Sequence, residues 1–450
     1  MMRRMSLHRR TVLGAGLAAV ATTLAGCREA VRSATAGASP APTVSASASA
    51  VPSRSAAAQD ATGTTVHGGA NAAGRLLVAL NRHLAPTPAN PNHPAYAGAV
   101  ALCQVNGATV ARACVGKALH YDAGPVLLPD SQQVAMRHDS IFDLASITKV
   151  YTAILALQQV DKGRIDLAAR VVDYLPDFTG TGKDKVTVAM LLAHTSGLPV
   201  GAKVAGLPDD AARRAAVLAT PLVSGAVPGT VYRYSSVGLM VLAFLVEKVT
   251  GQRFDQALKT GLTGPLGLKY TGFNPKTWLS AADQAARLVA TDARSSRGLL
   301  RGVVHDDVAN HMGGIAGHAG IFSTAAEVAV IGQLLLGGGS YNGTRILSAE
   351  ITRQMLTNVN AGLPAVDPER PNRTSAHGLG VVLDQPWFMG RLSRPRTFGH
   401  TGFTGTSLVV DPDRRVVLVL LTNRAHPNWS WANPDPVRVD VANVMAAIPR

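Results

Sequence analysis

Ser146 and Lys149 form the one S-x-x-K pattern in the 450-residue chain. Apolar residues recur at three- and four-residue steps from Ile147 to Val160, and this period predicts a helix that starts at the serine and ends at residues 162–163. Residues three apart lie on one helix face, so the hydroxyl and the amine can meet. A lysine whose pKa falls from about 10.4 toward neutrality can accept the serine proton and create a nucleophile. A polar first turn with a solvated lysine would give the same letters, so other residues must support the chemistry.

A second candidate is Tyr234, in a short loop at residues 228–235. This loop opens onto an apolar helix expected at residues 236–250, ending at Gly251. A phenol, with a reference pKa of about 10, could act as a base or a proton relay if a lysine cation lowered its pKa. The alternative is a tyrosine that only packs its ring against the helix.

A third candidate is the segment 399–403, Gly-His-Thr-Gly-Phe, near the start of a predicted strand. The glycine at 402 would let a substrate approach the backbone closely. The N–H of the next residue, Phe403, would then be available to bind negative charge that develops on a substrate oxygen. A plain entry into a strand is the alternative.

The elements that must position these residues are strands at both ends of the folded region and helices between them. The strands are expected at residues 98–105, 108–115, 378–383, 407–410 and 416–422. We therefore predict an α+β fold, in which an antiparallel sheet is built from both chain ends, is flanked by helices and carries a mostly helical insertion.

Cys103 and Cys114 flank a hairpin turn at residues 106–107, Asn-Gly. With a two-residue loop Cys103 would face Val110, which places Cys114 too far along the partner strand for a disulfide. Two reduced thiols are expected, unless a bulge shifts the register.

Residues 1–27 are predicted to be an export signal. Arginines precede a short apolar run at 12–24, and Arg9 and Arg10 resemble a twin-arginine signal, although the Sec route stays open. The segment 24–27, Leu-Ala-Gly-Cys, resembles a bacterial lipobox, in which Cys27 would be lipidated. An ordinary cleaved signal is the alternative.

Residues 28–70 are rich in Ala, Ser, Thr, Pro and Gly, which predicts a disordered tether, and residues 71–450 are predicted to form the folded domain. These segments predict a protein anchored by lipid to the outer face of the bacterial cell membrane, or alternatively a secreted one.

The net charge of +15 does not indicate a nucleic-acid partner. Without the four signal arginines, 39 basic residues stand against 28 acidic ones, and the basic residues are scattered, with no dense run beside aromatic residues. A domain that works near an anionic envelope accounts for the excess equally well.

The three candidate motifs, in this order, resemble the serine β-lactamase and penicillin-binding-protein superfamily, in the branch with class C β-lactamases, D-alanyl-D-alanine carboxypeptidases and family VIII esterases. The resemblance covers about residues 73–450. Further matching segments lie at residues 191–199, 304–307, 317–324 and 421–427.

The resemblance implies a catalytic role for three residues. Ser146 would be the acylated nucleophile, and Lys149 would help to deprotonate it. Tyr234 would share the role of the base and later activate the water that releases the acyl group. No cofactor is implied.

The same resemblance implies the substrate contacts. The N–H groups of Ser146 and Phe403 would bind the oxyanion, and His400, Thr401 and Gly402 would line the substrate. Ser236 stands where the family often has Asn, so one amide is replaced by a hydroxyl that can still donate a hydrogen bond. His400 replaces the lysine of the third motif, so we expect less fixed positive charge for a substrate carboxylate.

A group of five residues could suggest a metal site, because imidazole and carboxylate bind zinc. Its members are His305, Asp306, Asp307, His311 and His318. Their spacing matches no tight zinc motif, so no metal is predicted, and the resemblance places this loop near the catalytic cleft.

We therefore expect an exported serine hydrolase that forms an acyl-serine on ester or amide bonds, as a carboxylesterase or a D-alanyl-D-alanine carboxypeptidase. The expected partner is a small ester, a peptidoglycan peptide or a β-lactam. A β-lactamase and a catalytically weak penicillin-binding or cell-wall-binding protein are the alternatives.

Overall fold

The computed structural model describes residues 70–448, which belong to one compact unit of the chain, Ala58–Arg450. Residues 1–69 and 449–450 lie outside the described part. The predictions of an export signal, a lipidated Cys27 and a tether at residues 28–70 fall on these residues, so they stay predictions.

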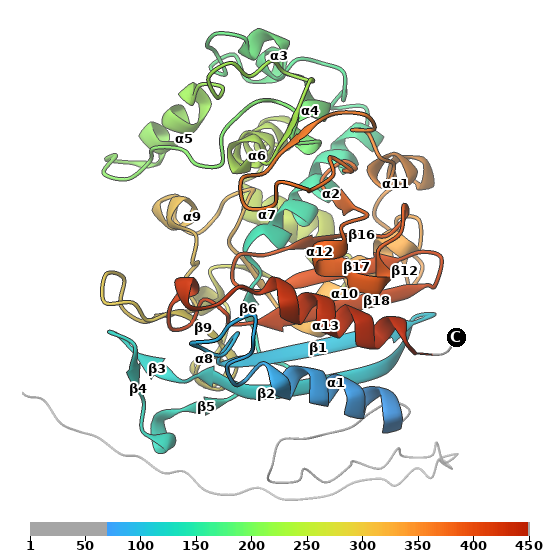
Figure 1. Ribbon diagram of the computed structural model, residues 1–450. Helices are drawn as coiled ribbons and strands as arrows, with labels where there is room; N and C mark the ends of the chain where they lie inside the picture. The colour runs from blue at the N-terminus through green and yellow to red at the C-terminus, as the bar shows by residue number, and fades with distance from the viewer. Residues whose placement is uncertain (1–69, 449–450) are drawn as a thin grey trace, which may run out of the picture. The chain divides into compact units, whose positions relative to one another are not determined.

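A seven-stranded antiparallel sheet is the centre of the fold (Figure 1). In spatial order its strands are β15 (Val382–Leu383), β16 (Phe398–Thr401), β17 (Ser407–Asp411), β18 (Val416–Thr422), β1 (Gly98–Val105), β2 (Ala108–Leu119) and β5 (Val134–Ala135). The N-terminal hairpin pairs with the C-terminal strands through β1 and β18, which run antiparallel. The predicted fold class is therefore confirmed. The strand expected at 378–383 is shorter than predicted and keeps only its last two residues.

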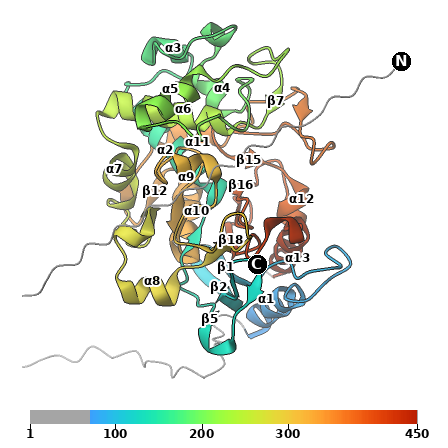
Figure 2. The same ribbon diagram turned by 90° about the vertical axis from the view of Figure 1, so that its left-hand side faces the viewer.

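The sheet is covered on both faces, which explains the apolar run of β18. Its residues alternate between two hydrophobic clusters: Val417 and Val419 face one, and Val416 and Leu418 face the other. A strand buried on both faces reads as a continuous apolar segment rather than an alternating one. Figure 2 shows α10 on one side of these strands and α13 with α1 on the other.

The helices follow the predicted boundaries closely where capping residues are present. Ser235 caps α6, because its Oγ accepts the Gly238 N–H at 3.0 Å, and Gly251 ends this helix with a φ of +67°. The helices are α1 (Ala70–Arg82), α2 (Thr148–Asp161), α3 (Val171–Tyr174), α4 (Val188–Leu192), α5 (Asp210–Ala219), α6 (Ser236–Thr250), α7 (Phe254–Leu258), α8 (Ala281–Arg287), α9 (Asp307–His311), α10 (Ala325–Leu336), α11 (Ala349–Met355), α12 (Pro386–Met389) and α13 (Asp435–Ala446).

Short strands outside the main sheet connect the loops of the candidate site. One small sheet has the strand order β6, β11, β8. A separate two-stranded sheet pairs β7 in parallel with β14. These and the remaining short strands are β3 (Tyr121–Asp122), β4 (Val126–Leu127), β6 (Phe142–Asp143), β7 (Tyr232–Arg233), β8 (Gly272–Phe273), β9 (Ala290–Asp292), β10 (Leu300–Arg301), β11 (Ile321–Ser323), β12 (Ser340–Tyr341), β13 (Thr344–Arg345) and β14 (Ala365–Val366). Between residues 70 and 448, no helix combines the length and the apolar character needed to cross a membrane.

The hairpin register differs from the simple two-residue prediction by a bulge. Cys103 faces Ala111 instead of Val110, because the register shifts between Cys103 and Gln104. Cys114 faces Val100, and no disulfide joins the two cysteines of the described chain. The expectation of two reduced thiols is confirmed, and the bulge explains the change of partner.

Candidate active site

The turn that carries Ser146 is held in an unusual conformation. Ser146 lies in a single 3-10 turn, Ala145–Ile147, directly before α2, rather than in the long helix itself. Ala145 has a φ of +47°, a left-handed conformation that alanine rarely adopts. Asp143 accepts the Ala145 N–H at 2.8 Å and fixes the turn. Backbone strain of this kind is typical of functional sites, where the surrounding fold holds a reactive residue in place.

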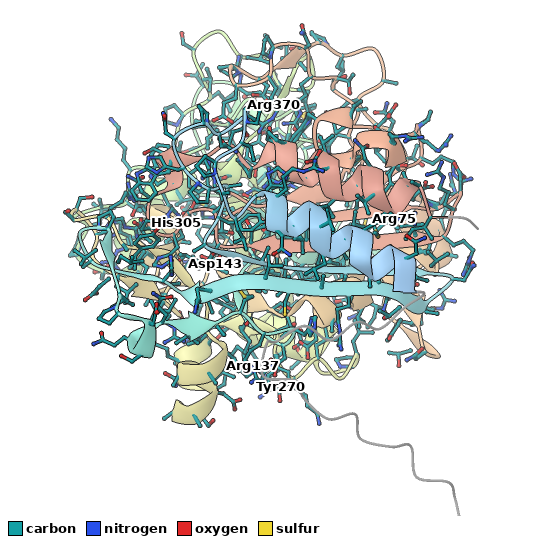
Figure 3. The ribbon with its side chains drawn as sticks, turned by 60° about the horizontal axis from the view of Figure 1, so that its bottom comes forward. Arg75, Arg137, Asp143, Tyr270, His305 and Arg370 are labelled. Atoms are coloured by element: carbon teal, nitrogen blue, oxygen red, sulfur yellow. The ribbon has the colours of Figure 1, made fainter. Side chains whose placement is uncertain are left out.

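Asp143 also ties this turn to the loop before α9. Its second carboxylate oxygen accepts the His305 N–H at 2.7 Å, and Figure 3 shows the two residues close together. Burial raises the pKa of Asp143, while the backbone N–H groups of His305 and Ala145 oppose the increase. The carboxyl group is therefore a structural link between two segments that are distant in the sequence.

Lys149 is buried and directly contacts the candidate nucleophile. Its Nζ lies 2.9 Å from the Oγ of Ser146 and donates to the backbone carbonyl of His318 at 3.0 Å. The helix α2 is buried on nearly all sides, so the lysine has no access to water. Burial lowers its pKa to about 7, and the charge of Asp306 opposes part of this decrease. Near neutral pH about half of these amines are uncharged and can accept the serine proton.

Tyr234 lies between β7 and α6, close to Lys149. The Nζ of Lys149 is 4.9 Å from the centre of its ring. Burial raises the pKa of Tyr234 to about 12, and hydrogen bonds with the hydroxyl groups of Ser146 and Ser236 oppose the increase. The condition that the sequence suggested, a Tyr234 pKa lowered by a lysine cation, is therefore not met, because burial is the largest influence and raises the pKa. At neutral pH the phenol keeps its proton and can donate or relay it.

The Tyr234 loop is held by His194, a residue of the segment 191–199 that resembles the family. The Nδ1 of His194 accepts the Ser235 N–H at 3.1 Å, and its ring lies 4.7 Å from the Tyr234 ring. The carbonyl group of His194 accepts the Arg233 N–H at 2.8 Å. Burial, and then the neighbouring His377, hold the pKa of His194 well below its usual value, so the ring is neutral and keeps the accepting lone pair.

His400 offers an acceptor rather than a positive charge. It is buried in β16, and its Nδ1 donates to the carbonyl group of Thr401 at 2.8 Å. Burial, followed by the charge of Lys149, holds the pKa of His400 well below its usual value. Its Nε2 is buried and accepts no hydrogen bond from the described residues. These properties agree with the expected loss of fixed charge at the third motif.

The backbone at Gly402 and Phe403 is fixed from several sides. The Gly402 N–H donates to the carbonyl group of Thr406 at 2.8 Å. A Cβ at position 402 would lie 2.4 Å from the carbonyl oxygen of Leu144, so this strand packs directly against the Ser146 turn. Within residues 70–448 the Phe403 N–H takes part in no hydrogen bond. The N–H is therefore not used within the described fold, and its binding of a substrate oxyanion stays a prediction.

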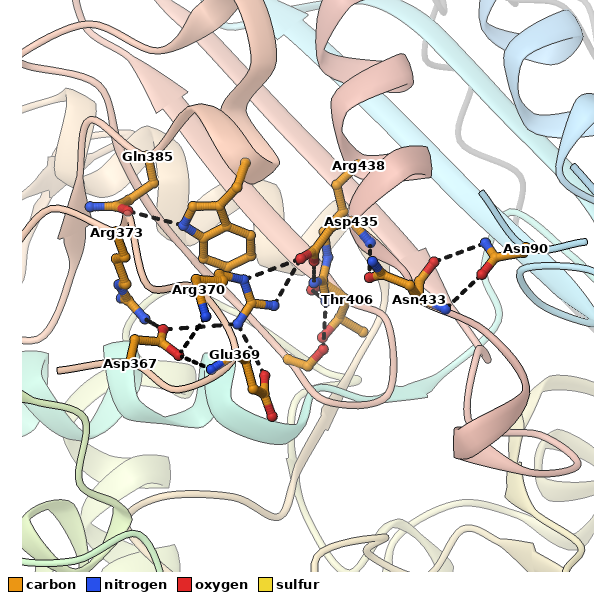
Figure 4. Close-up of polar contacts among 12 residues, drawn as sticks. Asn90, Asp367, Glu369, Arg370, Arg373, Gln385, Thr406, Asn433, Asp435 and Arg438 are labelled. Atoms are coloured by element: carbon orange, nitrogen blue, oxygen red, sulfur yellow. Dashed lines mark hydrogen bonds and ion pairs between the residues drawn. The ribbon is translucent and has the colours of Figure 1, made fainter. Parts of the chain in front are cut away.

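A chain of ion pairs that begins in α13 holds the backbone at Gly402 (Figure 4). The Nη2 of Arg438, a buried residue of α13, donates to the carbonyl groups of Gly402 at 2.7 Å and Thr406 at 3.1 Å. Its Nη1 pairs with Asp435 at 2.8 Å, and Asp435 pairs with Arg370 at 2.8 Å. The C-terminal helix thus positions the candidate oxyanion donor.

Arg373 belongs to the segment that this chain of ion pairs holds. Its Nη1 pairs with Asp367 at 3.0 Å, and its guanidinium lies 4.9 Å from the centre of the Tyr232 ring. The Nε is buried and has no partner among the described residues. Arg373 is one of the charges that act on the pKa of Tyr234, after burial and the hydrogen bond with Ser146. Its charge also acts to lower the pKa of His400, after burial and Lys149.

Five residues that the sequence suggested for a metal lie in separate contacts. His318 pairs with Asp306 at 2.9 Å, whereas His305 pairs with Asp292 at 3.3 Å. Asp307 pairs with Arg297 at 2.9 Å at the surface. In the described part of the chain, no group of three or more His, Cys, Asp or Glu side chains is arranged to hold a metal ion.

The structure thus brings Ser146, Lys149, Tyr234 and the third motif together, as expected. Ser236 is the first residue of α6, next to Tyr234, and Thr401 ends β16. Sequence reasoning missed Arg373, Arg438 and the contribution of Asp143. Arg438 could have been noticed in the sequence. It lies between Val437 and Val441 in α13, and a buried arginine among apolar helix residues is unusual.

Comparison with known proteins gives consistent matches. A sequence profile described as Beta-lactamase matches residues 80–443. An Escherichia coli K12 protein with the provisional name D-alanyl-D-alanine carboxypeptidase is 33% identical over 350 residues, which are 70% of this chain and 76% of that protein. A Salmonella agona relative with the same provisional name is 32% identical over 344 residues, 69% of this chain and 75% of the relative.

Two solved structures share the fold. A penicillin-binding-protein homologue from Caulobacter crescentus aligns with a TM-score of 0.61 at 20% identity, over 85% of this chain and 100% of its own. EstCE1, a hydrolase with promiscuous acyltransferase activity, aligns with a TM-score of 0.60 at 20% identity, over 82% of this chain and 98% of its own. The profile match and the sequence relatives show that this chain belongs to the β-lactamase family and is a serine hydrolase of that superfamily.

Proposed function

We propose that this hydrolase is a D-alanyl-D-alanine carboxypeptidase that forms an acyl-enzyme on Ser146. One observation carries the proposal: Lys149 lies 2.9 Å from the Ser146 hydroxyl and has a pKa lowered to about 7, the first cause being burial. A neutral amine at this distance is a suitable general base. The provisional names of the sequence relatives support the carboxypeptidase class.

Acylation would use the groups in a fixed order. Lys149 accepts the Ser146 proton while Oγ bonds to the substrate carbonyl carbon, and the carbonyl electron pair moves to oxygen. The N–H groups of Ser146 and Phe403 bind this oxyanion. Tyr234 donates its proton to the leaving amine as the C–N bond breaks, and it regains a proton from the Lys149 ammonium group. The products of this step are the acyl-serine and free D-alanine.

Deacylation would use the same groups in reverse. A water molecule attacks the acyl carbon and gives its proton through the Tyr234 phenol to the Lys149 amine. When the tetrahedral intermediate collapses, Ser146 leaves as the free hydroxyl after it takes the proton back from Lys149. The enzyme returns to its starting state without a cofactor.

A carboxylesterase is the second candidate, because His400 is neutral and a neutral ester needs no cation. The carboxypeptidase requires a positive group near the terminal carboxylate of the peptide, and we propose Arg373 for this role. Its Nη1 already donates to Asp367, whereas its buried Nε has no partner among the described residues and could donate to a substrate carboxylate.

We further propose that the protein is exported and held on the outer face of the cell membrane through a lipid on Cys27. This residue follows an apolar segment in a lipobox-like sequence. Replacement of Cys27 by Ser should move the protein from the membrane fraction to the soluble fraction. Equal membrane retention of both forms would contradict the lipid anchor.

The function is tested by intact-protein mass spectrometry and D-alanine release. Wild type and Ser146→Ala are each exposed to an acyl-D-Ala-D-Ala peptide, p-nitrophenyl butyrate and a penicillin. The proposal expects D-alanine release and an acyl adduct on wild type alone. Turnover of the ester without D-alanine release would favour the esterase, rapid penicillin turnover would favour a β-lactamase, and a stable adduct without turnover would indicate a weak penicillin-binding protein.

A further inference from the structure

The segment at residues 304–320 lies against α2 beside Lys149 and has no role in the proposed acylation and deacylation. The carbonyl group of His318 accepts a hydrogen bond from the lysine Nζ at 3.0 Å, and the carbonyl group of Gly317 accepts one from Thr152 at 2.6 Å, one helical turn further along α2. The Ile321 N–H donates to the Thr148 hydroxyl at 3.2 Å. Three successive contacts therefore hold this segment along α2, beside the candidate base.

In this segment the buried His318 pairs with Asp306, whose side chain is 36% exposed. The Nε2 of His318 lies 2.9 Å from the Oδ1 of Asp306. The same oxygen accepts the Ala309 N–H at 2.9 Å, so Asp306 is also the N-cap of α9. Burial lowers the pKa of His318 although the charge of Asp306 opposes the decrease, so the ring is neutral and donates from Nε2 to the carboxylate. The pair thus fixes the position of His318 and of its carbonyl group.

This carbonyl group determines how the lysine amine is oriented. A neutral amine has two N–H bonds and one lone pair. One N–H bond points to the carbonyl oxygen of His318, which leaves the lone pair able to point toward the Ser146 hydroxyl at 2.9 Å. A general base needs this orientation, because a proton moves along the line from the hydroxyl to the lone pair.

The charges around Lys149 are uneven. The titratable groups that act on Lys149 or lie against it come from four other segments and are Tyr234, His194, His400, His318 and Asp306. Of these, Asp306 alone carries a negative charge at neutral pH: the charge and hydrogen bond of His318 and the Ala309 N–H hold its pKa below the usual range despite burial.

We propose that Asp306 and His318 form a positioning pair for the base: the pair fixes the carbonyl group that orients the Lys149 amine, and Asp306 supplies the negative charge that stabilises the lysine after it has taken the serine proton. This inference rests on the proposed role of Lys149 and extends it to two residues that contact neither Ser146 nor the substrate. A carboxylate near a lysine raises the lysine pKa. Without Asp306, Lys149 would lose its proton at a lower pH.

The test is the pH profile of kcat/KM for p-nitrophenyl butyrate with Asp306→Asn. Asparagine keeps the N-cap and can still accept the His318 N–H, so only the charge is removed. We expect the acid limb of the profile, near pH 7 in wild type, to move down by about one pH unit. We also expect kcat/KM above pH 8 to fall about tenfold, because the lysinium ion is less stabilised during proton transfer.

Asp307→Asn is the matched control. It removes the same charge one residue away, but the Asp307 side chain is 72% exposed and its field is screened by water. Its acid limb should stay within about 0.2 pH units of wild type. If both variants, or neither, shifted the limb, the proposal for Asp306 would be wrong.

A second pair of variants tests the positioning role and covers a failure of Asp306→Asn to fold. His318→Gln can still donate to Asp306, and we expect it to retain activity within about threefold, whereas His318→Leu should lose about tenfold. Equal losses in both variants would contradict the pair. If Ser146→Ala kept wild-type turnover, the catalytic assignment itself would fail, whereas an unshifted Asp306→Asn profile with inactive Ser146→Ala would refute the positioning pair alone.

Discussion

Two sides of the candidate site differ in the charge that they offer. On the lysine side, Lys149 lies near the ionised carboxylate of Asp306 and has a pKa of about 7, set first by burial. On the histidine side, His194, His377 and His400 are buried together, and no carboxylate pairs with any of their rings in the described chain. Burial lowers the pKa of His377 to about 3, so this side is neutral through the range in which the lysine titrates.

The difference separates two tasks that one site must perform. On the lysine side, Lys149 takes up and releases the serine proton, because the charge of this residue changes near neutral pH. The histidine side controls geometry, because neutral rings position the Tyr234 loop and the strand of the third motif without a change of charge. Substitutions on the two sides should therefore have different signatures, and the following predictions test that contrast.

The largest effect is expected from Lys149→Met on the lysine side. Loss of the base should reduce kcat/KM for p-nitrophenyl butyrate by about 10³-fold. In wild type, activity should fall as the pH drops below about 7, because the lysine then becomes charged. In the variant this limb should vanish from stopped-flow pH profiles. A retained limb near pH 7 would assign that titration to another group.

Tyr234→Phe should have a smaller effect and a different signature. Removal of the phenol should reduce kcat by about 10²-fold, because the leaving group then departs without a proton donor. The acid limb near pH 7 should stay, since burial and Asp306 set the lysine pKa. Steady-state kinetics from pH 5 to 9 check both points. A lost limb would mean that the two residues titrate as one unit.

Arg373→Gln tests substrate choice on the histidine side. Loss of the guanidinium should raise KM for an acyl-D-Ala-D-Ala peptide about tenfold, because a charge-assisted hydrogen bond is lost. KM for the neutral ester should change less than twofold, a difference that initial rates can resolve. Arg396→Gln is the control, since Arg396 is an exposed arginine that pairs with Asp413 at 2.9 Å. Equal effects on both substrates would remove Arg373 from carboxylate recognition.

The histidine side should also make the fold sensitive to acid, a smaller effect. A buried neutral histidine such as His377 has a lower pKa in the folded state than in the unfolded chain, so its stabilisation is complete above about pH 6.5 and is lost as the pH falls toward the folded value. Each such ring should reduce the free energy of unfolding by up to about 1.4 kcal/mol per pH unit below 6.5.

Thermal melts from pH 7 to 5 measure this dependence. The Tm of His377→Gln should fall less steeply with decreasing pH than that of wild type, whereas His311→Gln, at an exposed residue of α9, should follow wild type. Parallel slopes for wild type and His377→Gln would show that this ring does not stay neutral in the folded protein.

The parts of the fold that local residues determine could be predicted from the sequence. The Asn-Gly turn predicted the β1–β2 hairpin, and the apolar run that stops at Gly251 predicted α6 at residues 236–250, because turn and helix-end chemistry acts over a few residues. The bulge after Cys103 could only be left open as a possibility, since an extra residue in one strand depends on the packing of the whole sheet. The left-handed Ala145 was missed for a similar reason.

The order of the three motifs predicted which residues meet at the site, but not how their protons are distributed. The pKa of Tyr234 depends on burial, which the neighbouring letters do not reveal. His318 and Asp306 were considered only as members of a group of possible metal ligands, and Arg438 was not singled out. Their contacts with Lys149 and Gly402 join segments that only the tertiary fold brings together.

The pairing of β1 with β18 has a consequence for how the protein is made. Ala99 pairs with Thr422, so the central strands of the sheet come from opposite ends of the folded region. During synthesis the β1–β2 hairpin leaves the ribosome long before β18 has been made, so the apolar face of the hairpin stays exposed to solvent in the meantime. Folding that depends on such distant pairs is slow. Loss of the last strands would therefore open the middle of the sheet, where the turn of Ser146 is held, rather than trim one edge.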